Sequence, residues 1–258
     1  GLRGAAAAAG LWITPWTDGA PDPSRAQRVA YVGPDAHAER WLPGGWFAGV
    51  DGWLRYQWFT PLAGSTLTVD DGPWVRADAV AGGWWGDGRR VVRITGGIDA
   101  TDRVTPHVTG EGWIRPGGLV APFGELRVGW ADDQDDVVAT RLGGLTPYHV
   151  PLAGAAWAEF WVEDYAAVRA GLGVHPGILS VAAFADLAVW TAPTRTTGPT
   201  DDGEGALGLG MSARVASNGW FVDLAGGLAP GLERQPGVGS GSVYLLAGSD
   251  WRPVRRVH

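Results

Sequence analysis

The sequence predicts an all-β fold of long antiparallel strands, and three observations support this prediction. Glycine and proline occur 42 and 18 times among 258 residues, so few windows are long enough for three uninterrupted helical turns. Apolar and polar side chains alternate with a period of two along most of the chain, which is typical of strands that have one apolar face. The alternating segments are mostly longer than the roughly five or six residues of an ordinary globular strand.

The alternation divides the chain into 12 expected strands within a single domain, residues 1–258, because no change of composition marks a linker. The clearest example is 44–59, where Val50, Leu54 and Tyr56 share an apolar face and Asp51 and Arg55 lie on the other face. Asn218-Gly219 is expected to form a tight type I′ hairpin turn. The expected strands are 2–14, 25–33, 44–59, 73–86, 89–100, 107–115, 119–132, 152–162, 178–190, 204–216, 219–229 and 239–250.

Long alternating strands fit either a soluble sandwich or a membrane barrel, and the connections between the strands favour the barrel. Counted back from the C-terminus, tight connections such as Pro116-Gly117-Gly118 alternate with longer ones such as 191–203. The connections 34–43 and 163–177 are longer than this rule expects. Strand lengths also centre on the roughly 9–11 residues that a tilted strand needs to cross a bilayer. The prediction is therefore a transmembrane, antiparallel, up-and-down β-barrel of about 12 strands, with 14 or 16 strands as alternatives.

The polar faces of these strands mix arginine with aspartate and glutamate, as the interior of a narrow barrel could. Pairs on one strand are expected between Asp51 and Arg55, Arg76 and Asp78, Arg93 and Asp99, Glu111 and Arg115, and Glu125 and Arg127. If the barrel is open, these charges would set conductance and selectivity; if they pair across a narrow lumen, the barrel is closed. The charges expected to face the lumen are Asp51, Arg55, Arg76, Asp78, Arg93, Asp99, Glu125, Arg127, Asp186, Arg214 and Asp223.

Tryptophan is unusually frequent, with 16 residues. Trp53, Trp113 and Trp161 fall on the charged face, where they would fill the lumen and favour a plugged barrel over an open channel. Most of the others lie near predicted strand ends, where an indole ring suits the boundary between lipid and water. These are Trp12, Trp46, Trp58, Trp74, Trp85, Trp130, Trp190, Trp220 and Trp251.

An ordered set of motifs lies in the C-terminal half. Arg141-Leu142-Gly143-Gly144 is followed by Ala156-Trp157-Ala158-Glu159-Phe160, then by 169–176, and then by Ala183-Phe184-Ala185-Asp186, which leads to Trp190. Over about 139–250 this order resembles the barrel of the bacterial surface-antigen family, the BamA-type outer-membrane proteins.

The resemblance implies a barrel in which Arg141, Gly143 and Gly144 belong to an external loop. Two departures separate this chain from the family pattern. Leu145 to Pro151 stand where the family has an Arg-Gly-aromatic loop tip, and these 258 residues contain no periplasmic repeats. The resemblance therefore extends to the barrel and leaves the family's assembly activity unsupported.

Composition excludes several functions. A net charge of -7 argues against a nucleic-acid partner, and the absence of cysteine excludes disulfides and thiolate metal sites. The five histidines are expected in connections or in the tail, with His107 at an external rim near Asp99 and Asp102. The acidic run 132–136 reads as a hydrated loop, since it lacks the glycine and distal glutamate of a calcium loop. We expect no enzyme activity, no cofactor and no metal.

The expected setting is the outer membrane of a bacterial cell, with the lipid bilayer as the first partner and other outer-membrane or periplasmic proteins as further partners. Within it the chain is expected to act as a membrane-embedded scaffold or a small pore, as part of a larger assembly. A secreted, tryptophan-rich β-sandwich that binds glycans is the alternative. An outer-membrane enzyme that modifies lipids is a weaker one.

Overall fold

The protein consists almost entirely of β-strands in the computed structural model, which describes 2–13, 16–17, 20–21, 24, 26–66, 69–86, 88–115, 117–133, 139–144, 150–155, 159–192, 204–217, 219–232 and 239–249. No helix in these ranges is long and apolar enough to cross a membrane. The predicted turn residue Asn218 and predicted rim residue Trp251 lie outside the described residues.

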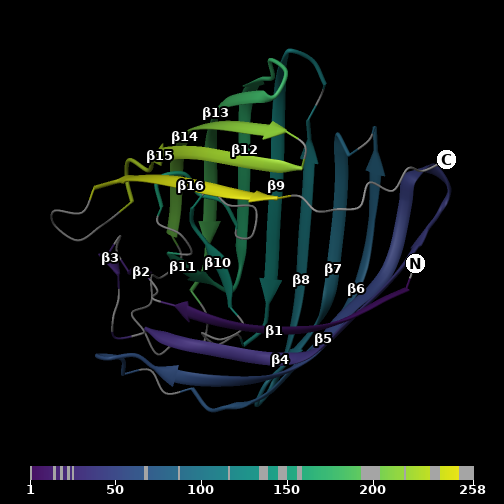
Figure 1. The fold of residues 1–258 in the computed structure, drawn as a ribbon, viewed down its shortest axis with the longest axis vertical. Coiled ribbons are helices and arrows are strands. Elements are labelled where there is room, and N and C mark those ends of the chain that lie inside the picture. The colour runs from purple at the N-terminus through teal and green to yellow at the C-terminus, as the bar shows by residue number, and fades with distance from the viewer. Residues whose placement is uncertain are drawn as a thin grey trace.

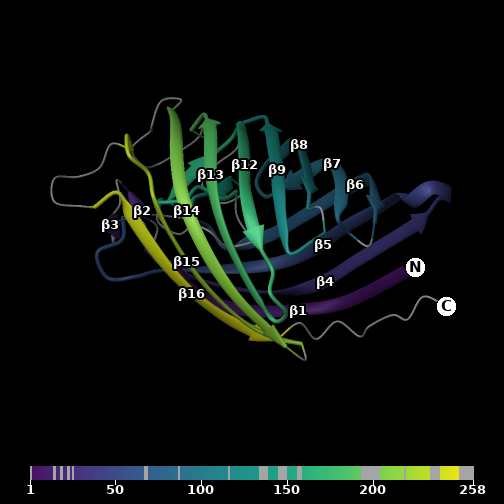
Figure 2. The same cartoon turned by 90° about the horizontal axis from the view of Figure 1, so that it is seen from above.

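Twelve strands form one antiparallel sheet in which each strand pairs with the next one along the sheet. The sheet curls strongly, so that its concave face encloses an interior (Figures 1 and 2). This is the fold of an up-and-down β-barrel with 12 strands, as predicted, and the sheet order begins at β1 and ends at β16. In sheet order the strands are β1 (Leu2–Ile13), β4 (Gln27–Trp41), β5 (Trp46–Pro61), β6 (Gly72–Trp85), β7 (Arg90–Ala100), β8 (Val104–Ile114), β9 (Val120–Ala131), β12 (Tyr165–Val174), β13 (Leu179–Trp190), β14 (Glu204–Ser217), β15 (Trp220–Leu228) and β16 (Gly241–Ser249).

Short elements complete the fold. A 3-10 turn at Pro43–Gly45 joins β4 to β5, and β2 (Trp16–Thr17) pairs with β3 (Ala20–Pro21). A second two-stranded piece, β10 (Thr140–Leu142) with β11 (Phe160–Val162), lies within the curve of the large sheet (Figure 1).

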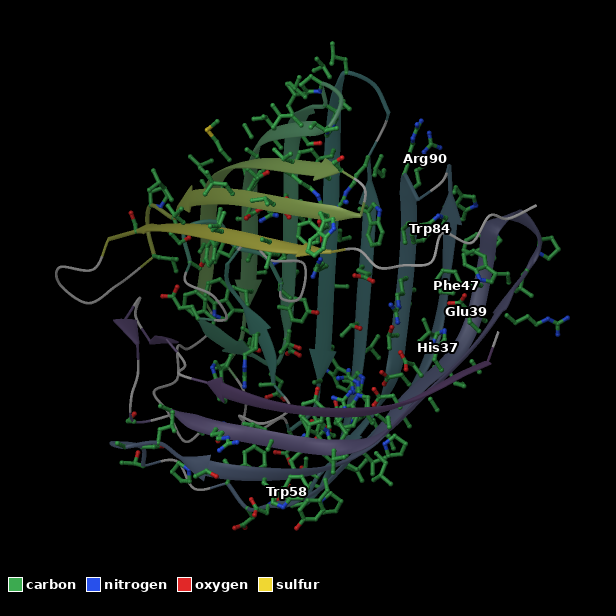
Figure 3. All side chains as sticks on the ribbon, viewed as in Figure 1. His37, Glu39, Phe47, Trp58, Trp84 and Arg90 are labelled. Carbon is green, nitrogen blue, oxygen red and sulfur yellow. The ribbon has the colours of Figure 1, made fainter. Side chains whose placement is uncertain are left out.

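The convex face of the sheet is apolar and exposed. On β5 the side chains of Val50, Leu54 and Tyr56 are 58%, 50% and 44% exposed, and Figure 3 shows Trp58 on the outer side of the same strand. Residues between them on the strand are less exposed and face the interior. A continuous apolar exterior around a charged interior is the reverse of a soluble sandwich and is typical of a membrane barrel.

Some predicted rim tryptophans lie elsewhere. Trp46, Trp130 and Trp220 are at least half exposed near strand ends, as an interfacial position requires. Trp190 is instead 4% exposed in an internal cluster, and the indole of Trp74 donates a hydrogen bond to Asp99 inside the sheet. The alternation with a period of two assigns a residue to one face of the sheet. It does not predict which tryptophans near strand ends point into the barrel.

Eleven of the 12 expected strands overlap an observed strand of the large sheet, and the expected strand 152–162 is wrong. Among the described residues of that segment only Phe160–Val162 form a strand, the internal β11, and all three are buried. The wall strand is β12, which lies in the supposed connection 163–177. The supposed connection 34–43 likewise belongs mostly to β4.

With these corrections the connections follow the barrel rule more closely. Tight connections join β4 to β5, β6 to β7, β8 to β9, β12 to β13 and β14 to β15, all at one end of the barrel, here called the short-turn end. Glycines with positive φ make these turns, among them Gly45 (83°), Gly88 (85°) and Gly219 (82°). The opposite end carries the longer connections, with a short one at 101–103 as the exception.

Candidate functional site

A segment between β9 and β12 folds into the barrel instead of leaving it. We call 139–163 the inner segment; its described residues are 139–144, 150–155 and 159–163, and they include β10 and β11. Leu142, Leu152 and Val162 are completely buried, in a cluster with Ala188 of β13 and Ala206 of β14. The inner segment therefore has its own apolar contact with the barrel wall.

Asp186 on β13 fixes this segment to the wall. The backbone N–H of Ala153 donates to Asp186 Oδ2 at 2.7 Å. Arg169, directly opposite on β12, donates to the same carboxylate through Nε (2.6 Å) and Nη2 (2.8 Å). Asp186 is only 1% exposed, so its charge is buried but fully partnered, which is the condition under which a buried carboxylate is tolerated.

Glycines in the wall allow the inner segment to lie directly against the strands. A Cβ at Gly208 on β14 would overlap the Ala153 carbonyl oxygen, and a Cβ at Gly227 on β15 would overlap the Ala153 side chain. On β16 the Tyr244 hydroxyl donates to the Ala155 carbonyl at 2.5 Å. The segment is thus held by four neighbouring strands, β13 to β16.

The family-like element Arg141, Gly143 and Gly144 lies within the inner segment. The glycines have φ of 120° and 85°, and both are buried. The Arg141 guanidinium lies 3.3 Å from the ring centre of Trp161. This places the element inside the barrel, in the connection from β9 to β12, which folds inward.

A second group of buried charges spans β6, β7 and β8. His107 is 3% exposed, with Nδ1 3.2 Å from Asp99 and Nε2 3.0 Å from Asp78. Arg76 lies 2.9 Å from the same Nε2 and 3.0 Å from Asp78. Gly97 makes room for this group, because a Cβ there would overlap the Asp78 carboxylate.

The expectation that His107 lies at an external rim is wrong: it is in β8, inside the barrel. A general base needs one ring nitrogen turned toward a substrate. Here both nitrogens of His107 face charged groups of the protein, so the geometry supports a structural charge cluster and offers no base.

The remaining predicted charges form pairs on the inner face, some of them with different partners from those expected. Arg76 pairs with Asp78 and Arg127 with Glu125 (2.6 Å), as predicted. Arg55 instead reaches Asp35 on β4 (3.2 Å). The other pairs are Arg93 with Glu111 (4.0 Å), Arg115 with Glu125 (3.6 Å), Arg214 with Asp223 (3.5 Å) and Asp51 with His37 (4.0 Å).

Arg169 and Asp35 also carry charges on the inner face, and the sequence pattern did not predict either of them. Both lay in segments assigned to connections. A signal for Arg169 was present, since Val168, Leu172 and Val174 alternate with it, and all three are exposed on the convex face. Among the described residues no cluster of histidine and acidic side chains could hold a metal ion.

Comparison with known proteins supports the fold. No family model matches the chain, and no curated protein matches it. Among solved structures it is similar to CdiB from Acinetobacter baumannii, an outer-membrane β-barrel transporter of the Omp85 superfamily, with a TM-score of 0.54 and 12% identity. The match covers 88% of this chain and 44% of CdiB, so this chain spans less than half of that protein. The fold is therefore that of a transmembrane β-barrel.

Proposed function

We propose that this chain is a bacterial outer-membrane β-barrel whose inner segment plugs the lumen, and that it serves as a membrane-embedded scaffold in a larger assembly. The exposed apolar convex face supports contact with lipid, because so large an apolar surface is unfavourable in water and favourable against lipid chains. The likeness to CdiB supports the same setting at the level of the fold. The proposed role is not enzymatic.

One observation carries the plugged state: the Asp186 carboxylate holds the inner segment through Ala153 while Arg169 neutralises it. A mobile loop would not need a buried carboxylate that accepts three hydrogen bonds. Together with the buried side chains of Leu142, Leu152 and Val162, this contact packs the inner segment against β13 and β14 inside the lumen.

We propose a larger assembly because the part of the barrel that spans the membrane offers little polar surface to a partner protein. The strands present apolar side chains outward and paired charges inward, so partners would meet the protein at its ends or at the edges β1 and β16. Other outer-membrane or periplasmic proteins are the partners that could reach those places.

Conductance in planar bilayers tests the plug. We expect the whole chain to insert without single-channel steps at neutral pH, and a variant in which a Gly-Ser linker replaces 139–163 to give steps. As a control, replacing 62–66 by Gly and Ser residues should give no steps, because these half-buried or exposed residues belong to the connection from β5 to β6 and not to the inner segment. Stable channels from the unaltered chain would contradict the scaffold role.

A pore is the second candidate, favoured by a cavity of about 250 Å³ that is lined by residues of β6 to β9 and by Tyr165 of β12. Arg76, Arg93, Glu111 and Arg127 line it, so a conducting state would carry ions past alternating charges. Single-channel conductance steps from the unaltered chain, together with a different ion preference in Arg93→Gln, would favour the pore over the scaffold.

A further inference from the structure

The barrel contains a second, larger hollow at its short-turn end. This cavity has a volume of about 510 Å³ and is lined by β9 and β12 to β15, by Arg115 in the connection from β8 to β9, and by Pro151 of the inner segment. Its rim includes Arg115 and the exposed His175, which lies in the connection from β12 to β13. The cavity therefore opens to solvent at the short-turn end and ends at the inner segment.

The wall of this cavity has more positive than negative charge. Four arginines line it, Arg115, Arg127, Arg169 and Arg214. Two carboxylates line it as well, Glu125 and Asp223. The lining therefore holds more guanidinium than carboxylate groups. Guanidinium groups bind carboxylates and phosphates with paired hydrogen bonds.

The same wall carries an apolar surface. Phe123 and Phe184 line the cavity with their ring centres 6.5 Å apart, and Pro122 and Pro151 lie beside them. The volume is in the range of sites that hold small organic ligands, roughly 300–1,000 Å³. A bare inorganic ion would leave this apolar wall and most of the volume unused.

We propose that the short-turn cavity binds an acidic, partly aromatic segment of a partner polypeptide that enters from the short-turn end. The carboxylates of the segment would contact Arg115 and Arg214, and an aromatic side chain would pack on Phe123 and Phe184. A lipid is disfavoured, because the cavity lies on the concave face and lipid would contact the convex face. This site goes beyond the scaffold role and does not depend on whether the inner segment blocks conduction.

Calorimetric titration of the whole protein in an uncharged detergent tests the site. The probe is the peptide Phe-Glu-Glu-Phe, with Phe-Arg-Arg-Phe and inorganic phosphate as comparison ligands. We expect saturable binding of the acidic peptide only, and at least a tenfold loss in affinity with Arg214→Gln or Arg115→Gln. Both arginines are about half exposed or more, so either change should leave the barrel folded, which heat-modifiable gel migration checks.

Arg90→Gln is the matched control. Arg90 lies at the same end of the barrel, at the start of β7, but outside the cavity (Figure 3). This variant changes the net charge equally and should bind the peptide as the unaltered protein does. Equal losses in Arg90→Gln and Arg214→Gln, equal binding of the basic peptide, or phosphate binding as tight as peptide binding would each overturn the proposal.

Discussion

Replacing Asp186 by alanine separates the stability of the wall from the docking of the inner segment. The change removes the acceptor of Ala153 and both acceptors of Arg169, whose side chain is 13% exposed. Breaking a buried ion pair by deleting one partner costs about 3–5 kcal/mol. The free energy of unfolding should fall by about that amount.

The docking of the inner segment itself loses less free energy than the whole fold does. Among its described residues, Ala153 contacts Asp186 through one hydrogen bond, and a bond to a charged acceptor contributes about 1.5–3 kcal/mol. The three fully buried side chains Leu142, Leu152 and Val162 remain, each worth about 1.5–3 kcal/mol of burial. Apolar packing therefore exceeds the lost bond, and most molecules should keep the segment docked.

Two assays follow from these magnitudes. Denaturant unfolding in detergent should show the loss of stability. Trypsin should cleave after Arg141 about 10- to 150-fold faster, as the lost bond makes undocking more frequent. Glu111→Gln is the control, because the Arg93–Glu111 pair is 4.0 Å long and about one-third exposed, and such pairs contribute at most about 1 kcal/mol. If Asp186→Ala behaved like Glu111→Gln in both assays, the anchoring role of Asp186 would be refuted.

Three further predictions concern the packing of the barrel. Leu152→Ala should lower the free energy of unfolding by about 2–5 kcal/mol, since Leu152 is completely buried; a loss under 1 kcal/mol in denaturant titration would contradict this. Arg141→Ala should cost about 1 kcal/mol through its contact with Trp161, and a cost equal to that of Leu152→Ala would show another role for Arg141. Leu126→Arg on the convex face should cost about 2–4 kcal/mol for refolding into lipid vesicles if Leu126 lies near the bilayer midplane. Thr109→Arg on β8, whose side chain faces the inner cavity, is the comparison, and equal costs would argue against a lipid-facing exterior.

The period of two predicted the fold because it depends only on which face each residue occupies. On β15, Val222 and Leu224 are exposed while Asp223 between them pairs with Arg214. The same pattern failed at 152–162, because Phe160, Trp161 and Val162 are buried on both faces of an internal strand. A short apolar run of this kind has the same pattern in a strand of the barrel wall and in a buried internal strand, so the pattern cannot distinguish the two.

The partners of the inner charges could not be predicted, because they depend on the register between strands. Asp99 meets His107 only because Gly97 is paired with His107 and Asp99 with Thr105 across β7 and β8. Arg55 and Asp51 share a strand but find partners on β4, at Asp35 and His37. Pairs two residues apart on one strand, such as Arg76 and Asp78, were predictable because their spacing is fixed within the strand.

Spin labels placed along β15 test the central claim most directly, and the absence of native cysteine makes single-cysteine labelling clean. Val222→Cys, Asp223→Cys and Leu224→Cys would each be labelled in protein reconstituted into lipid vesicles. We predict that the labels at 222 and 224 are accessible to oxygen and shielded from a water-soluble nickel complex, while the label at 223, on the face that lines the cavity, is less accessible to oxygen and more accessible to the nickel complex. Equal accessibility to the nickel complex at all three positions would contradict a barrel whose convex face lies in lipid.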